Sequence, residues 1–456
     1  MSSVAVRRND VDMTEGDIFR HLLKFAFPLL VGNIFQQLYN TVDTWVVGNY
    51  ASNEAYSAVG TVGPIINLLI GTFMGFASGA GVVISQFYGA GRHDKVKKAV
   101  STSIVMTFLV GVAFTVIGVI LTPYLLRLMK MPDTVFPEAK SYLTIYFSGL
   151  LSLVTYNMGA GILRAVGDSR RPFIFLVISS VINIVLDLIF VKTLGWGVSG
   201  VAIATVIAQS VSALLVLILL SRTTMCVKVD FLHLCIDKDA LKKIVMIGIP
   251  TSLQMALTSF SNIIVQSYIN YFGPDCMSGW TSYTKIDHLL ILPMQSISLA
   301  ASTFVGQNLG KGDVKRTKAG IKTANIMALV STVVLLIPVL IFAPALVRFF
   351  NPREEVVEIG AMFLRIISPF YLCCAVNQIQ CSSLRGAGKA KTVMIMMLTS
   401  FVFFRQAYLF IVANFISNTI IPIAMSYPAG WILATLVSSV ALRVVNLEKG
   451  RLVDKD

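Results

Sequence analysis

Twelve long apolar blocks, separated by short polar segments, dominate the pattern of hydrophobic and polar positions along the chain. An α-helix needs about 20 predominantly apolar residues to cross the ~30 Å hydrocarbon core of a bilayer. The pattern therefore predicts an all-α integral membrane protein with twelve transmembrane helices. The expected spans are 20–50, 55–88, 96–122, 138–163, 172–192, 197–221, 241–272, 277–309, 319–345, 357–384, 391–415 and 419–443.

Composition and charge agree with this pattern. Hydrophobic residues make up 55% and charged residues 13%, against roughly 25% charged in soluble proteins; the mean hydropathy is +0.77. With both termini in the cytoplasm, 28 of the 37 Lys and Arg residues fall in inside segments and 6 in outside loops, as the positive-inside rule requires. The net charge of +14 thus indicates topology and contact with membrane lipids, and we expect no nucleic-acid partner.

The two halves of the chain repeat each other at a shift of 221 or 222 residues. Pro28 matches Pro250, and Asn40 matches Asn262. Two longer motifs match in the same order: Gln86-x-x-Gly89-x-Gly91 with Gln307-x-x-Gly310-x-Gly312, and Leu163-Arg164-x-x-Gly167 with Leu384-Arg385-x-x-Gly388. Four ordered matches indicate an internal duplication.

The duplication predicts two six-helix lobes. Six spans is an even number, so both lobes enter the membrane in the same orientation and are related by a pseudo-twofold axis along the membrane normal. Such paired lobes are typical of carriers that work by alternating access. The expected organisation is a cytoplasmic tail 1–19, a first lobe 20–221, a linker 222–240, a second lobe 241–443 and a cytoplasmic tail 444–456.

Three carboxylates lie well inside the predicted spans: Asp43, Asp187 and Asp287. An ionisable group there costs about 2.5–3.5 kcal/mol on insertion scales, so each is a functional candidate. Asp43 and Asp187 each precede the outer end of their span by about five residues, which places them at a similar depth. Asn183 lies one helical turn before Asp187, on the same face.

A polar stripe precedes Asp43 on the first span. Asn33, Gln36 and Asn40 lead to Asp43 at spacings of 3, 4 and 3, so all four lie on one helix face. A polar stripe within the membrane must face protein or water. We expect it to line a cavity; the structural alternative is that its side chains hold helices together through hydrogen bonds.

Two facing carboxylates repel each other unless they share a proton or a cation. Asp43 and Asp187, with Asn183 and a hydroxyl such as that of Thr205, supply the oxygen ligands of a site for Na⁺ or H⁺. The matching positions in the second half are Val265 and Tyr408. The predicted ion site is therefore asymmetric and belongs to the first lobe.

Charged residues in the second half form a less defined group. Asp287 and Lys285 lie on span eight and Arg405 on span eleven. Asp287 is expected either to bind substrate or a proton, or to pair structurally with Arg405 or Arg365. Lys285, two positions away, points in another direction along the helix.

Pro28 and Pro250 lie inside the first span of each lobe, where each removes one backbone hydrogen bond. We predict that both are hinges; the alternative is a static kink.

Catalytic and cofactor motifs are not found in the sequence. Gly306 to Lys311 resembles a phosphate-binding loop but is one residue short and lacks the following Ser or Thr. The six cysteines show neither paired nor zinc-binding spacing. We therefore expect neither an enzyme nor a bound cofactor.

The segment Pro28 to Gly48, both repeated turn motifs and Asn183-Ile-Val-Leu-Asp187 together resemble multidrug and toxic compound extrusion (MATE) transporters, over nearly the whole chain. The resemblance implies two six-helix lobes and export of organic, often cationic compounds in exchange for Na⁺ or H⁺. In the branch with a first-lobe ion site, the motif residues fall on Asp43, Asn183, Asp187 and Thr205. A second branch has acids on spans seven and ten; here span seven has no acid after Asp239, and span ten has only Glu358, near its outer end.

The sequence thus predicts a multidrug efflux antiporter, expected as a monomer in the cytoplasmic membrane of a prokaryote. The rival is a flippase for a lipid-linked saccharide, which needs a cationic cavity for pyrophosphate. Lys285, Arg365 and Arg405 are its only candidate groups within the spans. A membrane-embedded transferase is disfavoured by the short outer loops, and a channel by the paired lobes.

Overall fold

The computed structural model describes residues 12–129 and 131–453, and all regular structure within these ranges is helical. Its α-helices are α1 (Ile18–Tyr50), α2 (Asn53–Gly89), α3 (His93–Leu128), α4 (Phe136–Ser148), α5 (Leu150–Ala165), α6 (Arg170–Asp187), α7 (Gly197–Arg222), α8 (Lys238–Asn270), α9 (Pro274–Lys311), α10 (Val314–Ile341), α11 (Ala343–Phe350), α12 (Glu354–Ile367), α13 (Tyr371–Gly386), α14 (Ala390–Leu398), α15 (Arg405–Ile411), α16 (Ile420–Ala424) and α17 (Ser426–Val444). Segments η1 (Leu188–Thr193), η3 (Thr399–Phe404) and η4 (Val412–Ile416) are π-helical, and η2 (Ser368–Phe370) and η5 (Glu448–Gly450) are 3₁₀-helical.

Within the described ranges, eleven helical stretches are long and apolar enough to cross a membrane. The remaining predicted span, 138–163, corresponds to α4 and α5, which turn at Gly149. A Cβ atom at Gly149 would clash with a methyl carbon of Val206 on α7, so close helix packing requires glycine there. The predicted all-helical membrane architecture with twelve spans is confirmed, with the fourth span built from two helices.

The repeated glycine motifs form the carboxyl-terminal caps of helices. At the end of α2, Gly91 has φ +69° and Arg92 N–H donates to Phe87 O at 3.0 Å; at the end of α9, Gly312 has φ +90° and Asp313 N–H donates to Asn308 O at 2.9 Å. This is the Schellman pattern, which glycine favours because left-handed backbone strains other residues. The Leu-Arg-x-x-Gly motifs end α5 and α13 in the same way.

Packing divides the chain into two units that exchange the starts of their first helices. One unit contains Pro28–Gly248; the other contains Met13–Phe27 and Ile249–Asp456. Helix α1 therefore passes from the second unit to the first at Pro28, and α8 passes from the first to the second immediately before Pro250. The lobes expected from span order, 20–221 and 241–443, do not have this exchange.

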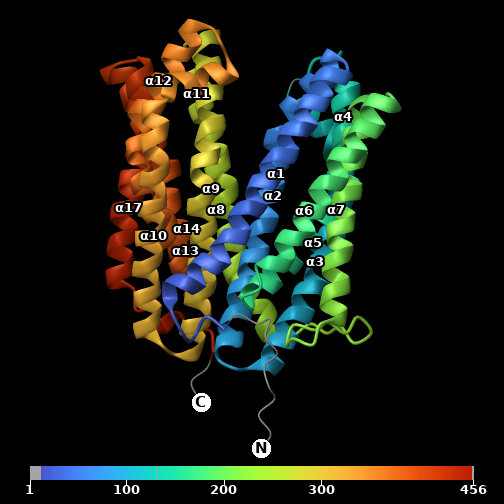
Figure 1. Cartoon of the computed structure of the whole chain (residues 1–456), viewed down its shortest axis with the longest axis vertical. Helices are drawn as coiled ribbons and strands as arrows, with labels where there is room; N and C mark the ends of the chain where they lie inside the picture. The colour runs from blue at the N-terminus through green and yellow to red at the C-terminus, as the bar shows by residue number, and fades with distance from the viewer. Residues whose placement is uncertain (1–11, 130, 454–456) are drawn as a thin grey trace, which may run out of the picture. The chain divides into compact units, whose positions relative to one another are not determined.

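Each unit has its own packed interior. In the first, Val46 and Val47 of α1 are fully buried in a core with Leu143 and Phe147 of α4 and apolar residues of α5 and α7. Small residues permit close contact, as where Gly118 of α3 meets the Phe147 ring. In the second, α9 packs along α10, α12 and α13 (Figure 1).

Candidate ion-coupling site

Three helices of the first unit bring the predicted ion ligands into its interior. Asp43 comes from α1, Asn183 and Asp187 from α6, and Thr205 from α7. Asp187 has no exposed surface, Asn183 is 2% exposed and Asp43 is 9% exposed. Thus α1, α6 and α7 bury these polar groups instead of presenting them to lipid.

Local helix geometry sets the direction of the α6 side chains. Asn183 and Asp187 are four residues apart and so lie one above the other on one face. Helix α6 ends at Asp187, and the π-helical segment η1 begins at the next residue. A π-helical turn within a span is rare and is frequent at functional sites.

The asparagine and the threonine are joined. Thr205 Oγ1 donates to the carbonyl of Val201 at 2.9 Å. The Asn183 Nδ2 donor lies 3.5 Å from Thr205 Oγ1. Because its amide nitrogen faces Thr205, the carbonyl oxygen of Asn183 is left as a free acceptor.

The carboxyl groups of Asp43 and Asp187 are near enough to act directly on each other. Among the described residues no donor satisfies Asp43 Oδ1, Asn183 Oδ1 or either carboxylate oxygen of Asp187. Buried acceptors normally have partners, and a buried carboxylate pair needs a shared proton or a cation. The possible ligand atoms are all oxygens, which suit Na⁺ or H⁺. The described ranges contain no cluster of three or more His, Cys, Asp or Glu residues for a multivalent metal.

Tyrosines that the sequence analysis did not select complete the surroundings of this pair. Tyr142 of α4 lies within electrostatic range of both Asp43 and Asp187, and Tyr39 and Tyr146 lie within range of Asp43. The rings of Tyr142 and Tyr146 stack at 6.2 Å between centroids. The available signal was their spacing of four residues inside an apolar span, which places two phenols on one helix face.

The polar stripe of α1 stays accessible. Asn33 is half-buried, whereas Gln36 and Asn40 are exposed. Gln36 interacts with Tyr39 on the next turn. The stripe is therefore a set of accessible polar groups leading along α1 to Asp43.

The three charged candidates of the second unit do not converge on one another. Asp287 accepts a hydrogen bond from the Tyr371 hydroxyl, which lies 3.2 Å from that of Tyr283. The Lys285 ammonium lies 5.3 Å from the centre of the Phe350 ring. Arg405 donates to Ser261 Oγ at 2.7 Å and to Asn262 Oδ1 at 2.8 Å. Among the described residues Asp287 has no ion pair with Arg405 or Arg365.

The second-unit counterparts of the aspartate pair carry no charge. Val265 is fully buried, and the Tyr408 hydroxyl donates to the carbonyl of Pro422 at 3.1 Å. The repeat therefore reproduces the helices of the first unit without its carboxylates.

The family model MatE matches residues 28–189 and 250–411. The chain belongs to this family. Both ends of the second matched segment lie 222 residues after those of the first, in agreement with the shift found in the sequence. The two matched segments begin at Pro28 and Pro250.

Named relatives and a solved structure are similar to most of the chain. The probable multidrug resistance protein YoeA of Bacillus subtilis is 28% identical over 427 residues, which cover 92% of each chain. The probable multidrug resistance protein NorM of Thermotoga maritima is 26% identical, over 84% of this chain and 83% of the relative. A MOP superfamily transporter structure from Pyrococcus furiosus shares the fold, with a TM-score of 0.91, 23% identity, and coverage of 96% of this chain and 97% of the other.

Proposed function

We propose that this multi-pass membrane protein exports organic, often cationic compounds in exchange for Na⁺ or H⁺. The observation that carries the proposal is the buried pair Asp43 and Asp187: Asp43 Oδ1 and both carboxylate oxygens of Asp187 lack donors in the described chain. The names of the relatives YoeA and NorM support drug export. The proposed location is the cytoplasmic membrane of a prokaryote, with both termini in the cytoplasm and the protein acting as a monomer.

The coupling ion binds between the two carboxylates in this mechanism. Because two close carboxylates in a poorly solvated site disfavour double ionisation, the site carries about one negative charge and accepts one monovalent cation or one further proton. Asn183 and Thr205 add neutral oxygen ligands. Ion binding from outside favours the conformation that releases substrate.

The driving force is sufficient for useful export. One elementary charge moving through 100 mV supplies about 2.3 kcal/mol. That free energy supports a gradient of about fiftyfold for a neutral substrate. Binding of the ion and of the substrate must then favour different conformations, since a ligand shifts an equilibrium only through its differential affinity.

The positions of the cations in the second unit argue against flipping of a pyrophosphate-linked lipid and so favour export of organic compounds. Arg405 is 1% exposed and already binds Ser261 and Asn262. Lys285 contacts a separate aromatic ring. No group of converging cations for a pyrophosphate is thus present among these candidates.

The proposal is tested by measuring drug transport in vesicles with the sodium and pH gradients imposed separately. Concentrative transport under one gradient, lost in Asp187→Asn, is the expected result. Transport that depends on neither gradient would refute ion coupling.

A further inference from the structure

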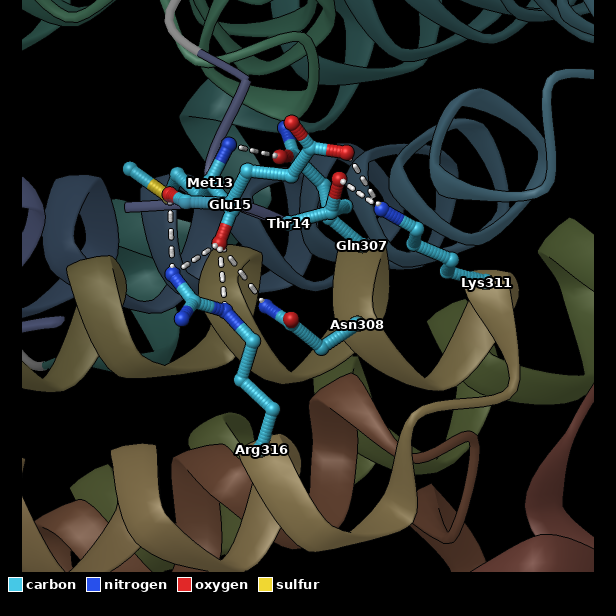
Figure 2. Close-up of polar contacts among 7 residues, drawn as sticks. All are labelled: Met13, Thr14, Glu15, Gln307, Asn308, Lys311 and Arg316. Carbon is cyan, nitrogen blue, oxygen red and sulfur yellow. Dashed lines mark hydrogen bonds and ion pairs between the residues drawn. The ribbon is translucent and has the colours of Figure 1, made fainter. Parts of the chain in front are cut away.

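The residues that precede α1 are bound to the end of α9 and the start of α10 (Figure 2). The Met13 side chain is fully buried, and Thr14 is 7% exposed. Met13 N–H donates to Gln307 Oε1 at 3.1 Å, and Asn308 Nδ2 donates to the Met13 carbonyl at 3.2 Å. Both polar groups of one backbone residue are thus held by neighbouring side chains of the repeated glutamine motif.

Two cations strengthen this attachment. Arg316 donates through Nη2 to the carbonyls of Met13 at 3.2 Å and Glu15 at 2.9 Å. Lys311 Nζ lies 3.0 Å from Glu15 Oε1 and 3.2 Å from Thr14 Oγ1. Charge-assisted hydrogen bonds are roughly twice as strong as neutral ones, so Arg316, which binds two backbone carbonyls, is the principal contact.

The attachment coincides with the exchange of helix starts between units. Residues 13–27 belong to the second unit, whereas α1 belongs to the first unit from Pro28 onward. Residues 18–27 are the first part of a continuous helix, so fixing residues 13–15 fixes this part as well. Pro28 weakens the helix at the point where the unit changes.

The residues just before α8 are also held by side chains of a neighbouring helix, but the side chains differ. Ser101 of α3 binds both backbone groups of Cys235, at 2.9 and 2.8 Å, and Thr102 accepts from Asp237 N–H at 2.9 Å. Backbone hydrogen bonding by Ala240, and the nearby Lys98, keep the pKa of Asp237 below its usual range. Because the two attachments use unlike residues, sequence duplication alone does not account for both.

We propose that Met13–Glu15, the amino-terminal clasp, fixes residues 18–27 to the second unit through Arg316, Gln307 and Asn308, and so makes Pro28 the point about which the rest of α1 moves with the first unit. The linker residues Cys235 and Asp237, bound to α3, fix the start of α8 to the first unit in the same way. The transport readout below rests on the proposed function, whereas the exchange readout is independent of it.

The first test is hydrogen–deuterium exchange of Arg316→Ala against Lys315→Ala. Lys315 is an exposed cation on the same turn of α10 and serves as the matched control. Loss of the charge-assisted bonds of Arg316 is expected to speed exchange in residues 13–27 by about tenfold in Arg316→Ala alone. Equal exchange in the two variants would overturn the assignment of the clasp contacts.

The second test is transport. Deleting residues 2–15 removes the clasp, whereas deleting residues 2–11 leaves it. The longer deletion and Arg316→Ala are expected to lower drug transport severalfold with drug affinity unchanged, and the shorter deletion to preserve transport. Normal transport without the clasp, at accelerated exchange, would leave the clasp as an attachment with no role in the cycle and overturn the proposal, without bearing on ion coupling.

The third test asks whether the clasp stays closed during transport. A short thiol crosslinker joins Glu15→Cys to Lys311→Cys in a Cys235→Ser background, with the singly substituted chains as controls. Crosslinked protein is expected to retain transport, since the clasp moves with the second unit. Transport that stops on crosslinking and returns on cleavage of the linker would contradict a fixed clasp.

Discussion

The two units bury ionisable groups in opposite ways. In the first, Asp43 and Asp187 face each other and their buried oxygens lack donors in the described chain. In the second, Asp287 accepts from Tyr371, and Arg405 donates to Ser261 and Asn262. A buried polar group with partners is stable as it stands, whereas an unpartnered carboxylate pair requires something from solution. The repeat has kept the helices and caps in both halves and the carboxylate pair in one.

The largest expected effect follows from removing one carboxylate of the pair. Asp43→Asn and Asp187→Asn keep the side-chain size but leave one carboxylate, which no longer needs to share an ion. Each is expected to reduce gradient-driven transport to the level without a gradient. The measurement is drug uptake into vesicles. Size-exclusion chromatography of each purified variant checks that it is folded.

The matched controls are the repeat counterparts Val265→Ala and Tyr408→Phe, for which coupling should remain. Should Tyr408→Phe abolish ion dependence while Asp187→Asn retains it, the site has been placed in the wrong half.

A smaller effect is expected for the neutral ligand. Thr205→Val removes one oxygen beside Asn183 and is expected to weaken ion affinity by about tenfold. Thr332→Val is the control, because Thr332 is a buried threonine of α10 that also donates to the carbonyl four residues earlier. The measurement is the ion concentration that half-inhibits drug binding. Equal shifts in both variants would indicate a general effect of removing a helix hydroxyl.

The smallest effect on coupling is expected in the second unit. Tyr371→Phe removes the donor to Asp287 and should lower the free energy of unfolding by about 1–3 kcal/mol, while the ion dependence of transport is unchanged. Asp287→Asn keeps an acceptor for Tyr371 and should cost less stability. Thermal unfolding and ion titration of both variants separate these outcomes; loss of ion dependence in Asp287→Asn would place a second coupling group in this unit.

The sequence predicted the features that depend on local pattern. The length of each apolar block predicted the spans, and helical spacing predicted that Asn183 and Asp187 share a face. The break at Gly149 was not predicted, because it depends on packing against Val206 of another helix. Tyr142 and Tyr371 were not selected because a neutral phenol in an apolar span leaves no charge signature, and its partner is set by packing. The repeated glutamine motif was visible, but its binding of Met13 joins residues nearly 300 positions apart.

Competition between substrate and ion is the most direct measurement of coupling through Asp43 and Asp187. A fluorescent organic cation is titrated into purified protein at several sodium concentrations and, separately, at several pH values. We expect one ion to weaken cation binding and the cation to weaken binding of that ion by the same factor, as linkage requires. Both effects should vanish in Asp187→Asn. Independent, additive binding of the organic cation under both ion titrations would contradict antiport through Asp43 and Asp187.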